Sequence, residues 1–422
     1  SELDILVVDG TPLYFPLVSG VITTELQTPL SHLSILGQNR QIPIMASKTI
    51  SDHEAIRKLE GKYVKLKVKD GDYTLRSSVF NKRNHKQQQS KKIKLKANLK
   101  VDTLVRFDNL KKISSSSIGN KAKNFASLHR LSKINNFKVP ENSFAIPFYF
   151  YDQHITNNGI DTLISHVAND TSKNNLPERL RFIRQAIKKA PFNKVLLEQI
   201  TTQLLKDKDY KKYRFRSSTN AEDMNGFNGA GLYDSKSAIL NDSTKTIEKA
   251  VKKVWASLWN YNAYLEREYF NINHQEALMG ILVHRSFPNE KVNGVAITKN
   301  IYRESNIGFI INAQIGNESV VNPSPGVECD QIICYETNSS GAIYSEKNII
   351  EIVTTSNLND KKLVMTHEEI ISLSKQLSKI KRYFYDKTKG YYSEYAKFGL
   401  DVEFKLDTDS RQLYIKQVRP YN

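Results

Sequence analysis

The sequence contains few cysteines and no long hydrophobic run. Its 422 residues include two cysteines, Cys329 and Cys334, which are too few for a disulfide framework or a structural zinc site. No apolar stretch approaches the length of a membrane span, and the N-terminus lacks the basic-then-apolar order of a signal peptide. We therefore expect both cysteines to be reduced, no membrane partner, and a cytoplasmic location.

Acidic residues are fewer than basic ones. The chain has 62 lysines and arginines against 44 aspartates and glutamates, a formal net charge of +18. Such a charge is compatible with nucleic acid, an anionic membrane surface or a phosphorylated ligand. No aromatic residue interleaves the most basic stretch, so a solvated linker is favoured there and nucleic-acid binding is the minor alternative. That stretch holds Lys82, Arg83, Lys86, Lys91, Lys92, Lys94, Lys96 and Lys100.

The length and periodicity predict two or three domains of mixed α/β type. Residues 1–80 combine short buried strands with short helices, which predicts a small layered unit. Residues 81–103 lose apolar periodicity, and they could span about 25 Å as a coil or about 75 Å fully extended. Residues 104–422 return to long helices, with antiparallel strand pairs toward the end. The expected helices are 121–131, 177–189, 194–206, 244–266 and 367–387, and the strands are 5–8, 20–24, 42–46, 63–68, 212–216, 281–284, 294–298, 308–312, 401–404 and 412–416.

His32 lies at the predicted start of a short helix. Pro29 stops the preceding segment, Ser31 is a favourable N-cap, and Leu33 and Leu36 give the helix one apolar side. Unpaired backbone N–H groups and the helix dipole favour negative charge at that end, so a phosphoryl group on His32 would be partly neutralised there. The alternative is an ordinary capped surface helix, which is the commoner outcome for an isolated histidine.

Two further stretches suit a polyphosphate. A predicted strand carries Arg216 into a loop with Gly226, Gly229 and Gly231. Glycines let backbone N–H groups approach phosphate oxygens, and an arginine adds a bidentate cation. Lys121 stands at the entry of a helix, where a lysine can reach a phosphate as a mobile point charge. Each feature alone also occurs in ordinary hairpins and helix ends.

Carboxylate and amide side chains gather on the last two predicted strands. Alternation places Asp401 and Glu403 on one face, and a hairpin brings Gln417 and Arg419 near them. Mg²⁺ prefers a few protein oxygens together with nucleotide phosphates. The strand pair therefore predicts a magnesium site, and a polar sheet face with surface ion pairs is the alternative.

The order of these stretches resembles the pyruvate phosphate dikinase and phosphoenolpyruvate synthase family. Gly119 to Lys121 resembles the opening of its ATP-grasp nucleotide domain, and 401–403 with 417–420 resembles its closing motifs. Residues 216–218 together with 221–223 resemble its arginine motif. The segment around His32 resembles the swivelling phosphohistidine domain. The resemblance covers nearly the whole chain outside the linker. The other matching segments are 20–25, 42–46, 139–144, 254–259, 294–298 and 318–321.

The resemblance implies a fold, cofactors and a role for each residue. The fold would be an α/β and α+β multidomain chain: a phosphohistidine domain at 1–80, a basic polar linker at 81–103 and an ATP-grasp domain at 104–422. ATP and Mg²⁺ would be the cofactors, and His32 would take the β-phosphoryl group of ATP, with release of AMP and phosphate. By the same resemblance, Lys121, Arg216 and Arg419 would hold phosphates beside the loop of Gly229 and Gly231, Glu318 would bind the ribose, and Glu403 and Gln417 would bind magnesium.

Within the family, details of the sequence are closer to the glucan water dikinases. Segments 30–34 and 229–235 resemble theirs, the histidine domain precedes the nucleotide domain, and no pyruvate-binding barrel is expected in this chain. The leading hypothesis is therefore an ATP-dependent dikinase core with a glucan-like acceptor, and pyruvate is the alternative acceptor. Asn120, Asn262 and Asn317 replace residues that are usual in the family. They favour a further alternative, a degenerate nucleotide-binding regulatory protein.

Overall fold

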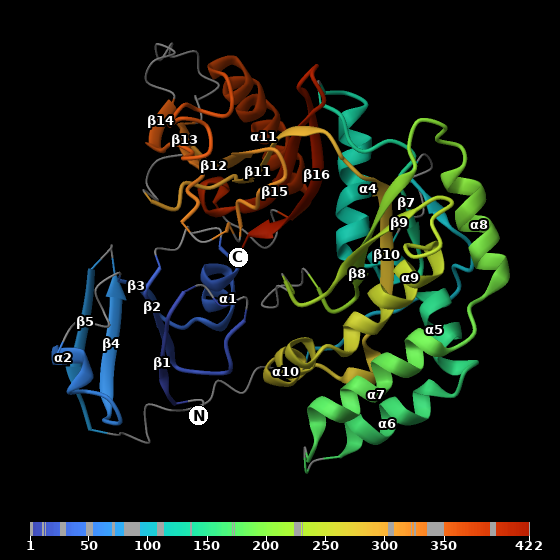
Figure 1. The fold of residues 1–422 in the computed structure, drawn as a ribbon, viewed down its shortest axis with the longest axis horizontal. Helices are drawn as coiled ribbons and strands as arrows, with labels where there is room; N and C mark the ends of the chain where they lie inside the picture. Colours follow the sequence, from blue (N-terminus) through green and yellow to red (C-terminus); the bar gives the residue numbers. More distant parts are fainter. Residues whose placement is uncertain are drawn as a thin grey trace. The chain divides into compact units, whose positions relative to one another are not determined.

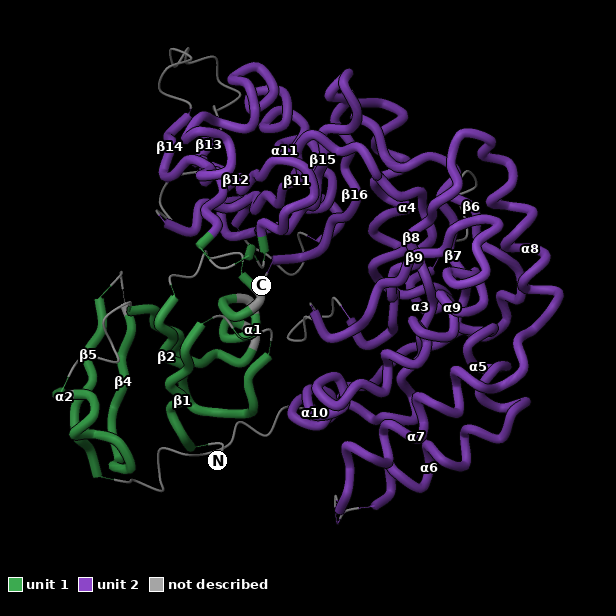
Figure 2. Tube along the Cα trace, in the orientation of Figure 1, with its two compact units in different colours: residues 1–91, 321–326, 422 green, residues 92–320, 327–421 purple. Residues whose placement is uncertain are grey.

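The computed structural model divides the chain into two compact units (Figure 2). The first unit comprises residues 1–91, 321–326 and 422, and the second comprises residues 92–320 and 327–421. Among the described residues, no helix is both long enough and apolar enough to cross a bilayer. The structure describes residues 3–10, 12, 14–25, 31–47, 54–69, 72–79, 93–107, 114–135, 137–170, 172, 174–222, 229, 231–302, 308–321, 323–324, 326–335, 350–388 and 394–421.

The first unit is built on a three-stranded parallel sheet (Figure 1). Parallel neighbours need a crossover connection, and the helix α1 supplies it between β2 and β3. A separate antiparallel hairpin and one short helix complete the unit, and Leu66 and Leu75 of the hairpin pack against Ile22 and Met45 of the sheet. The elements are β1 (Ile5–Val8), β2 (Gly20–Thr23), α1 (His32–Arg40), β3 (Ile44–Ala46), α2 (Glu54–Arg57), β4 (Val64–Lys69) and β5 (Asp72–Ser77).

Helix α1 begins where the sequence predicts. The Ser31 hydroxyl accepts a hydrogen bond from the Ser34 N–H at 3.2 Å, so Ser31 is the N-cap. Leu33 and Leu36 bury one side of the helix in a cluster with Val21 of β2. The cap and the buried side of the helix therefore fix the position of its first residue, His32, in the connection between β2 and β3.

Sheet D, the first sheet of the second unit, is five-stranded and antiparallel, with the order β6-β7-β10-β8-β9. Helix α9 packs on β8, β9 and β10, and α7 packs on α9. The strands are β6 (Val105–Arg106), β7 (Phe144–Ile146), β8 (Lys212–Thr219), β9 (Ser235–Ile239) and β10 (Met279–Arg285). The helices around them are α3 (Ser115–Ile118), α4 (Asn120–Ser132), α5 (Phe148–Thr156), α6 (Ile160–Asn169), α7 (Leu176–Lys189), α8 (Lys194–Leu204), α9 (Ile247–Ala256), η4 (Ser257–Trp259), α10 (Tyr261–Tyr269) and η5 (His274–Glu276).

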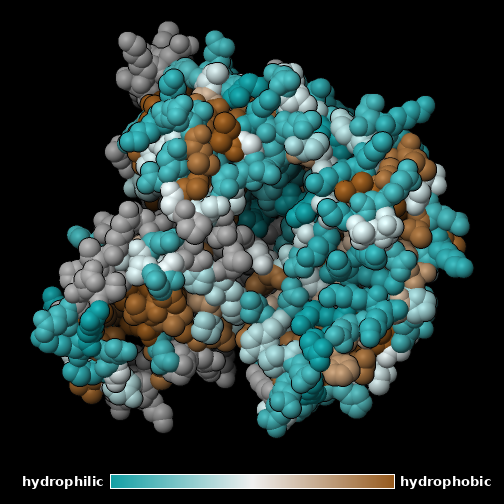
Figure 3. Space-filling model, in the orientation of Figure 1, coloured by the Kyte–Doolittle hydropathy of each residue, from teal (hydrophilic) through white to brown (hydrophobic). Residues whose placement is uncertain are grey.

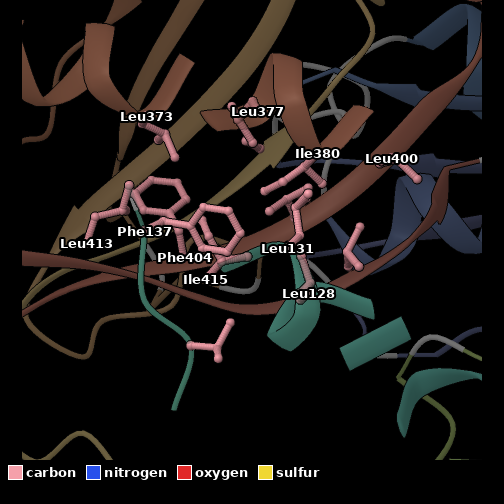
Figure 4. Close-up of a cluster of buried hydrophobic side chains, with 14 of the residues drawn as sticks. Leu128, Leu131, Phe137, Leu373, Leu377, Ile380, Leu400, Phe404, Leu413 and Ile415 are labelled. Carbon is pink, nitrogen blue, oxygen red and sulfur yellow. The ribbon is translucent and has the colours of Figure 1, made fainter. Parts of the chain in front are cut away.

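Sheet E, the second sheet of this unit, is six-stranded and antiparallel, with the order β14-β13-β12-β11-β15-β16. Long helix α11 covers it, and Leu377 of α11 lies in one hydrophobic cluster with Phe404 of β15 and Leu131 of α4 (Figure 4). Helix α4 also contacts β8, so one helix touches both sheets. The elements are β11 (Glu290–Ile297), β12 (Gly308–Ile315), β13 (Asp330–Tyr335), β14 (Ile350–Thr354), α11 (His367–Thr388), η7 (Tyr395–Lys397), β15 (Gly399–Asp407) and β16 (Gln412–Tyr421).

The mixed α/β class and the C-terminal antiparallel pairs are confirmed. The single helix predicted over 244–266 is wrong, because the chain leaves the helical conformation at Asn260, with φ −62° and ψ 142°. A tertiary contact fixes this break: the Trp259 indole N–H donates to the Tyr151 hydroxyl at 2.9 Å. In the basic stretch, 81–92 lies outside the described residues, whereas Leu95 is buried and Ile93 forms a β-bridge with Ile272.

Candidate functional site

Arg216 on β8 links sheet D to sheet E. Its Nη2 donates to Oε1 and Oε2 of Glu403 at 2.9 and 3.1 Å, and to Oε1 of Gln417 at 2.7 Å. Glu403 on β15 is the register partner of Gln417 on β16, as the hairpin prediction requires. Three acceptor oxygens thus converge on one cationic nitrogen. On the face shown in Figure 3, hydrophilic residues line a hollow between the parts of the second unit that carry the two sheets.

Lys416 joins this cluster because of a β-bulge. The register passes from Glu403 opposite Gln417 to Phe404 opposite Ile415, so Lys416 is the extra residue. A bulge re-aims side chains that strict alternation would send to the other face. The Lys416 Nζ lies 3.2 Å from Oε2 of Glu403. Glu403 therefore faces two cations.

The charges around Glu403 perturb several ionisation equilibria. Burial would raise the pKa of Glu403, but Arg216 and Lys416 outweigh it and hold the pKa well below its usual range. Burial lowers the pKa of Lys416 to about 8 against the attraction of Glu403. Burial and the charge of Arg216 also hold the pKa of His284 well below its usual range. The carboxylate of Glu403 is consequently ionised at neutral pH, and the imidazole of His284 is neutral.

Arg419 forms the next pair along the same two strands. Its Nε donates to Oδ2 of Asp401 at 2.7 Å, and its Nη2 donates to the same oxygen at 2.5 Å. Both residues are buried, and Oδ1 of Asp401 has no hydrogen-bond partner among the described residues. Because a buried acceptor without a partner is costly, this oxygen has capacity for a further donor or cation.

A glycine lets helix α4 approach β8 closely. Gly119, between α3 and α4, has φ +82°, a conformation that favours glycine. A Cβ added there would lie 2.3 Å from the carbonyl oxygen of Ser218, so any side chain would collide with the strand. The Ser218 hydroxyl also accepts a hydrogen bond from the Ala122 N–H at 3.0 Å. Gly119 therefore brings the first turn of α4 against β8.

This approach places Lys121 in a buried polar cluster. The Lys121 Nζ lies 2.7 Å from Oε1 of Glu222 and 3.3 Å from the hydroxyl of Ser217, the residue after Arg216. The Asn120 side chain donates to the carbonyl of Glu222 at 2.8 Å. Oε2 of Glu222 has no hydrogen-bond partner among the described residues. Asn120, a departure from the family pattern, thus fixes the backbone of the residue that pairs with Lys121.

The glycine-rich loop ends beside the same carboxylate. Gly226 lies outside the described residues. A Cβ added at Gly229 would lie 3.1 Å from Cγ of Glu222, and Gly231 has φ +75°. Gly229 thus allows a close approach to Glu222, and Gly231 supplies a left-handed turn before β9. Gly229 therefore lies beside the carboxylate that pairs with Lys121.

The remaining predicted residues lie elsewhere in the chain. Glu318 follows β12, and its carbonyl accepts a hydrogen bond from the Asn293 side chain at 2.7 Å. Asn317 beside it is exposed, and Asn262 is half-buried in α10. His32 is the first residue of α1 in the first unit, and its side chain lies outside the described residues.

Sequence reasoning left three members of this region out of the predicted site. Glu222 lies within the segment 221–223 of the arginine motif, and a buried acidic residue there could have been paired with Lys121. Lys416 stands next to Gln417, but alternation assigns it to the opposite face. From the sequence, His284 is a residue of a predicted strand, and no nearby motif suggests a partner for its side chain. Its Nδ1 shares a hydrogen bond with the carbonyl of Arg285 at 2.7 Å, and its Nε2 has no described hydrogen-bond partner.

The oxygens around Arg216 are chemically suited to a divalent cation. Glu403 and Gln417 direct oxygens at a single point where the structure holds a guanidinium nitrogen. Carboxylate and amide oxygens are ligands that Mg²⁺ accepts, usually with water and phosphate completing its shell. Among the described residues, no group of three or more His, Cys, Asp or Glu side chains could hold a metal. A metal at this point would therefore need ligands from water or a phosphate.

Comparison with known families identifies the class of protein. Residues 115–422 match the model of the pyruvate phosphate dikinase AMP/ATP-binding domain. This segment is more than half of the chain and contains both antiparallel sheets except for strand β6, together with the clusters of Arg216 and Lys121. The chain belongs to the pyruvate phosphate dikinase family.

Several curated relatives are similar to the chain over part of its length. It is 27% identical over 282 residues to a probable phosphoenolpyruvate synthase of Pyrococcus horikoshii, covering 61% of this chain and 32% of the relative. It is 27% identical over 260 residues to the uncharacterized phosphotransferase YvkC of Bacillus subtilis, covering 58% of this chain and 29% of the relative. It is 26% identical over 214 residues to the rifampicin phosphotransferase of Bacillus cereus, covering 50% of this chain and 24% of the relative. These matches span about a third or less of each relative.

Proposed function

We propose that this chain is the nucleotide-binding and phosphohistidine core of an ATP-dependent dikinase. The observation that carries the proposal is the convergence of Arg216, Glu403 and Gln417 from two sheets, inside the segment that matches an AMP/ATP-binding domain. Phosphoryl transfer asks a protein mainly for positioning and for cations near the transferred group. The cluster supplies both requirements.

The nucleotide would bind between the two antiparallel sheets, as in an ATP-grasp domain. Lys121, Arg216 and Arg419 are the cations proposed to hold its phosphates. Each of them is paired with a carboxylate: Glu222, Glu403 and Asp401 respectively. The carboxylates hold the three cations in position before the nucleotide binds. Phosphate oxygens would then replace the carboxylates as partners of these cations. Gly229 and Gly231 would allow the backbone to approach the phosphates, and Glu318 is proposed to bind the ribose.

Glu403 and Gln417 are the proposed magnesium ligands. Because both direct oxygens at the Arg216 nitrogen, a metal there would compete with Arg216 for Glu403. Arg216 would then be available to a phosphate oxygen. Bound Mg²⁺ would neutralise phosphate charge, as it does in phosphotransfer sites generally.

His32 is the proposed phosphoryl carrier, in a swivelling domain at 1–80 that a linker at 81–103 joins to the nucleotide domain at 104–422. The attacking imidazole nitrogen must be neutral, which holds largely at pH 7 for an unperturbed histidine. The β-phosphorus would form a bond to that nitrogen and break its bond to the oxygen shared with the α-phosphate, releasing AMP. The γ-phosphoryl group, still joined to the β-phosphoryl group, would then leave as inorganic phosphate when water attacks the γ-phosphorus and the bond to the bridging oxygen breaks. His32 begins the nine-residue helix α1, whose dipole would favour the added negative charge.

The third substrate is proposed from the relatives. The names of several relatives specify phosphoenolpyruvate synthesis, and that of another specifies rifampicin phosphorylation. The glucan-like acceptor favoured by the sequence details receives no support from these relatives. A pyruvate-type acceptor is therefore the better supported proposal.

The reaction is tested by the products of ATP. In the absence of an acceptor, we expect one equivalent of AMP per chain, released in a burst that His32→Ala abolishes. Lys121→Met should weaken Mg-ATP binding and remove the burst. His166→Ala, an exposed histidine on α6, is the matched control and should leave the burst unchanged. ADP as the nucleotide product would contradict a dikinase.

The alternative is a nucleotide-binding regulatory protein with a degenerate site. The observation that favours it is Asn120, whose side chain has a structural contact to the Glu222 carbonyl. This alternative predicts nucleotide binding without AMP formation. Measuring both on one preparation separates it from the dikinase, because a dikinase binds ATP and also releases AMP.

A further inference from the structure

A small basic pocket is lined by residues of α7, of α9 and of the segment that leads into β9. Figure 1 labels these three elements. Its volume is about 190 Å³, which is below the range of about 300–1,000 Å³ that is typical of pockets for drug-sized molecules. The pocket therefore suits a small ligand. Its charged lining consists of Arg184 and Lys188 from α7, Asp234 directly before β9, Lys236 in β9, and Lys253 from α9.

This pocket is separate from the proposed nucleotide site. In the register of β8 with β9, Arg216 lies opposite Ser235, and Phe215 lies opposite Lys236. Successive strand residues point to opposite faces of a sheet, so Lys236 belongs to the face opposite Arg216. Helix α9, which supplies Lys253, packs against that strand pair.

The positive charge of the pocket is only partly compensated. Four cations line it against one carboxylate, Asp234, whose Oδ2 lies 2.8 Å from Nζ of Lys236. Arg184 is fixed by a hydrogen bond from its Nη1 to the Trp259 carbonyl at 2.7 Å. The side chains of Lys188 and Lys253 have no hydrogen bond or ion pair with any residue that the structure describes.

The cations also repel one another. Burial lowers the pKa of Lys188, and the charges of Arg184, Lys253 and Lys236 lower it further, against the attraction of Asp234. Burial lowers the pKa of Arg184 as well, and the charge of Arg181, which does not line the pocket, lowers it further against the attraction of Asp234. Lys188 and Lys253 are both exposed, so water is the acceptor for their ammonium groups. An anion with two negative charges would relieve this repulsion and accept hydrogen bonds from both lysines in place of water.

We propose that this pocket binds a phosphate group, either free phosphate or the group of a small phosphate monoester. Arg184 offers a planar, fixed donor, and Lys188 and Lys253 offer mobile charges that can close on the anion. The proposal concerns a second anion site and does not rest on the dikinase activity. Its test can be made with the nucleotide site already filled.

Equilibrium dialysis of labelled inorganic phosphate against the full chain tests the pocket, at physiological ionic strength and with saturating Mg²⁺ and a non-hydrolysable ATP analogue. We expect one remaining phosphate site, and Lys188→Gln with Lys253→Gln should weaken it at least about tenfold. The matched control is Lys189→Gln with Lys249→Gln, which changes two exposed lysines on the same helices and the same net charge. The control should bind as the unchanged chain does.

Two results would overturn the proposal: no phosphate bound beside the analogue, or equal weakening by the pocket and control variants. Equal weakening would mean that net charge alone attracts the anion. Urea unfolding of both variants verifies that they are folded, and exposed substitutions of this kind shift stability by about 0.5 kcal/mol or less. Repeating the dialysis with glucose 6-phosphate assigns the source, because tighter binding of the ester identifies a phosphate monoester and tighter binding of phosphate identifies the free ion.

Discussion

Replacing Glu403 with glutamine should lower the free energy of unfolding, because it removes the negative charge from the cluster between the two sheets. In the structure the two carboxylate oxygens accept hydrogen bonds from Arg216 at 2.9 and 3.1 Å, and Nζ of Lys416 lies 3.2 Å from one of them. Glutamine keeps a side-chain oxygen of similar position but carries no charge. Glu403→Gln therefore leaves two cations facing neutral amides.

The expected loss of stability follows from burial and charge. The side chains of Arg216 and Glu403 are 13% and 22% exposed, so solvent screens the pair only in part. Breaking a fully buried ion pair costs about 3–5 kcal/mol, and a hydrogen bond to a charged group contributes about 1.5–3 kcal/mol. For this partly buried cluster we expect Glu403→Gln to lower the free energy of unfolding by about 2–3 kcal/mol.

Urea unfolding at pH 7 measures this loss, and a double-mutant cycle with Arg216→Gln isolates the pair. We expect a coupling energy of about 1–2 kcal/mol, within the range for residues in one network. Glu198→Gln, which changes an exposed residue of α8, is the control for a lost charge and should change stability by about 0.5 kcal/mol or less. Additive effects of Glu403→Gln and Arg216→Gln would refute the electrostatic link between the sheets.

Three further substitutions test other parts of the structure. In urea unfolding, Gly119→Ala should destabilise the chain by about 2 kcal/mol more than Gly159→Ala. Both glycines have positive φ, but only at Gly119 would the added Cβ collide with backbone, at 2.3 Å from the Ser218 carbonyl oxygen. Equal losses of stability would contradict the close approach of α4 to β8. The pKa of His284 is depressed in the folded state, so below about pH 6.5 the unfolded state binds more protons than the folded state. The free energy of unfolding should therefore fall by up to about 1.4 kcal/mol for each unit by which the pH is lowered. His284→Phe should reduce that slope, and an unchanged slope between pH 7 and 5 would contradict a buried neutral imidazole. Lys121→Met leaves its buried carboxylate partner unpaired and should cost about 3 kcal/mol at pH 7, whereas a loss below about 1 kcal/mol would show that the pair is not formed.

Local patterns in the sequence were sufficient to predict the closing hairpin. Alternation on two neighbouring strands with a short turn determines which side chains lie opposite each other. The structure pairs Asp401 with Arg419 and Glu403 with Gln417, as expected. The N-cap at Ser31 is confirmed for the same reason, since a cap depends on residues three positions apart.

Features that depend on distant segments could not be predicted. Arg216 meets Glu403 across 187 residues of sequence, and nothing local to either residue indicates the other. Lys416 reaches the cluster through a bulge that breaks alternation. Strand β9 (Ser235–Ile239) has little apolar alternation, and it forms because β8 supplies its backbone partners. In each case a tertiary partner determines the local conformation.

The transfer of phosphate to His32 is the central claim, and labelling with ATP that carries ³²P at the β position tests it most directly. After incubation with Mg²⁺ and no acceptor, we expect about one acid-labile label per chain at His32, none on His32→Ala, and full label on His166→Ala. ATP labelled at the γ position should leave the protein unlabelled, because the γ-phosphoryl group departs as inorganic phosphate. Label that persists in His32→Ala, or transfer of the γ label instead of the β label, would contradict the account.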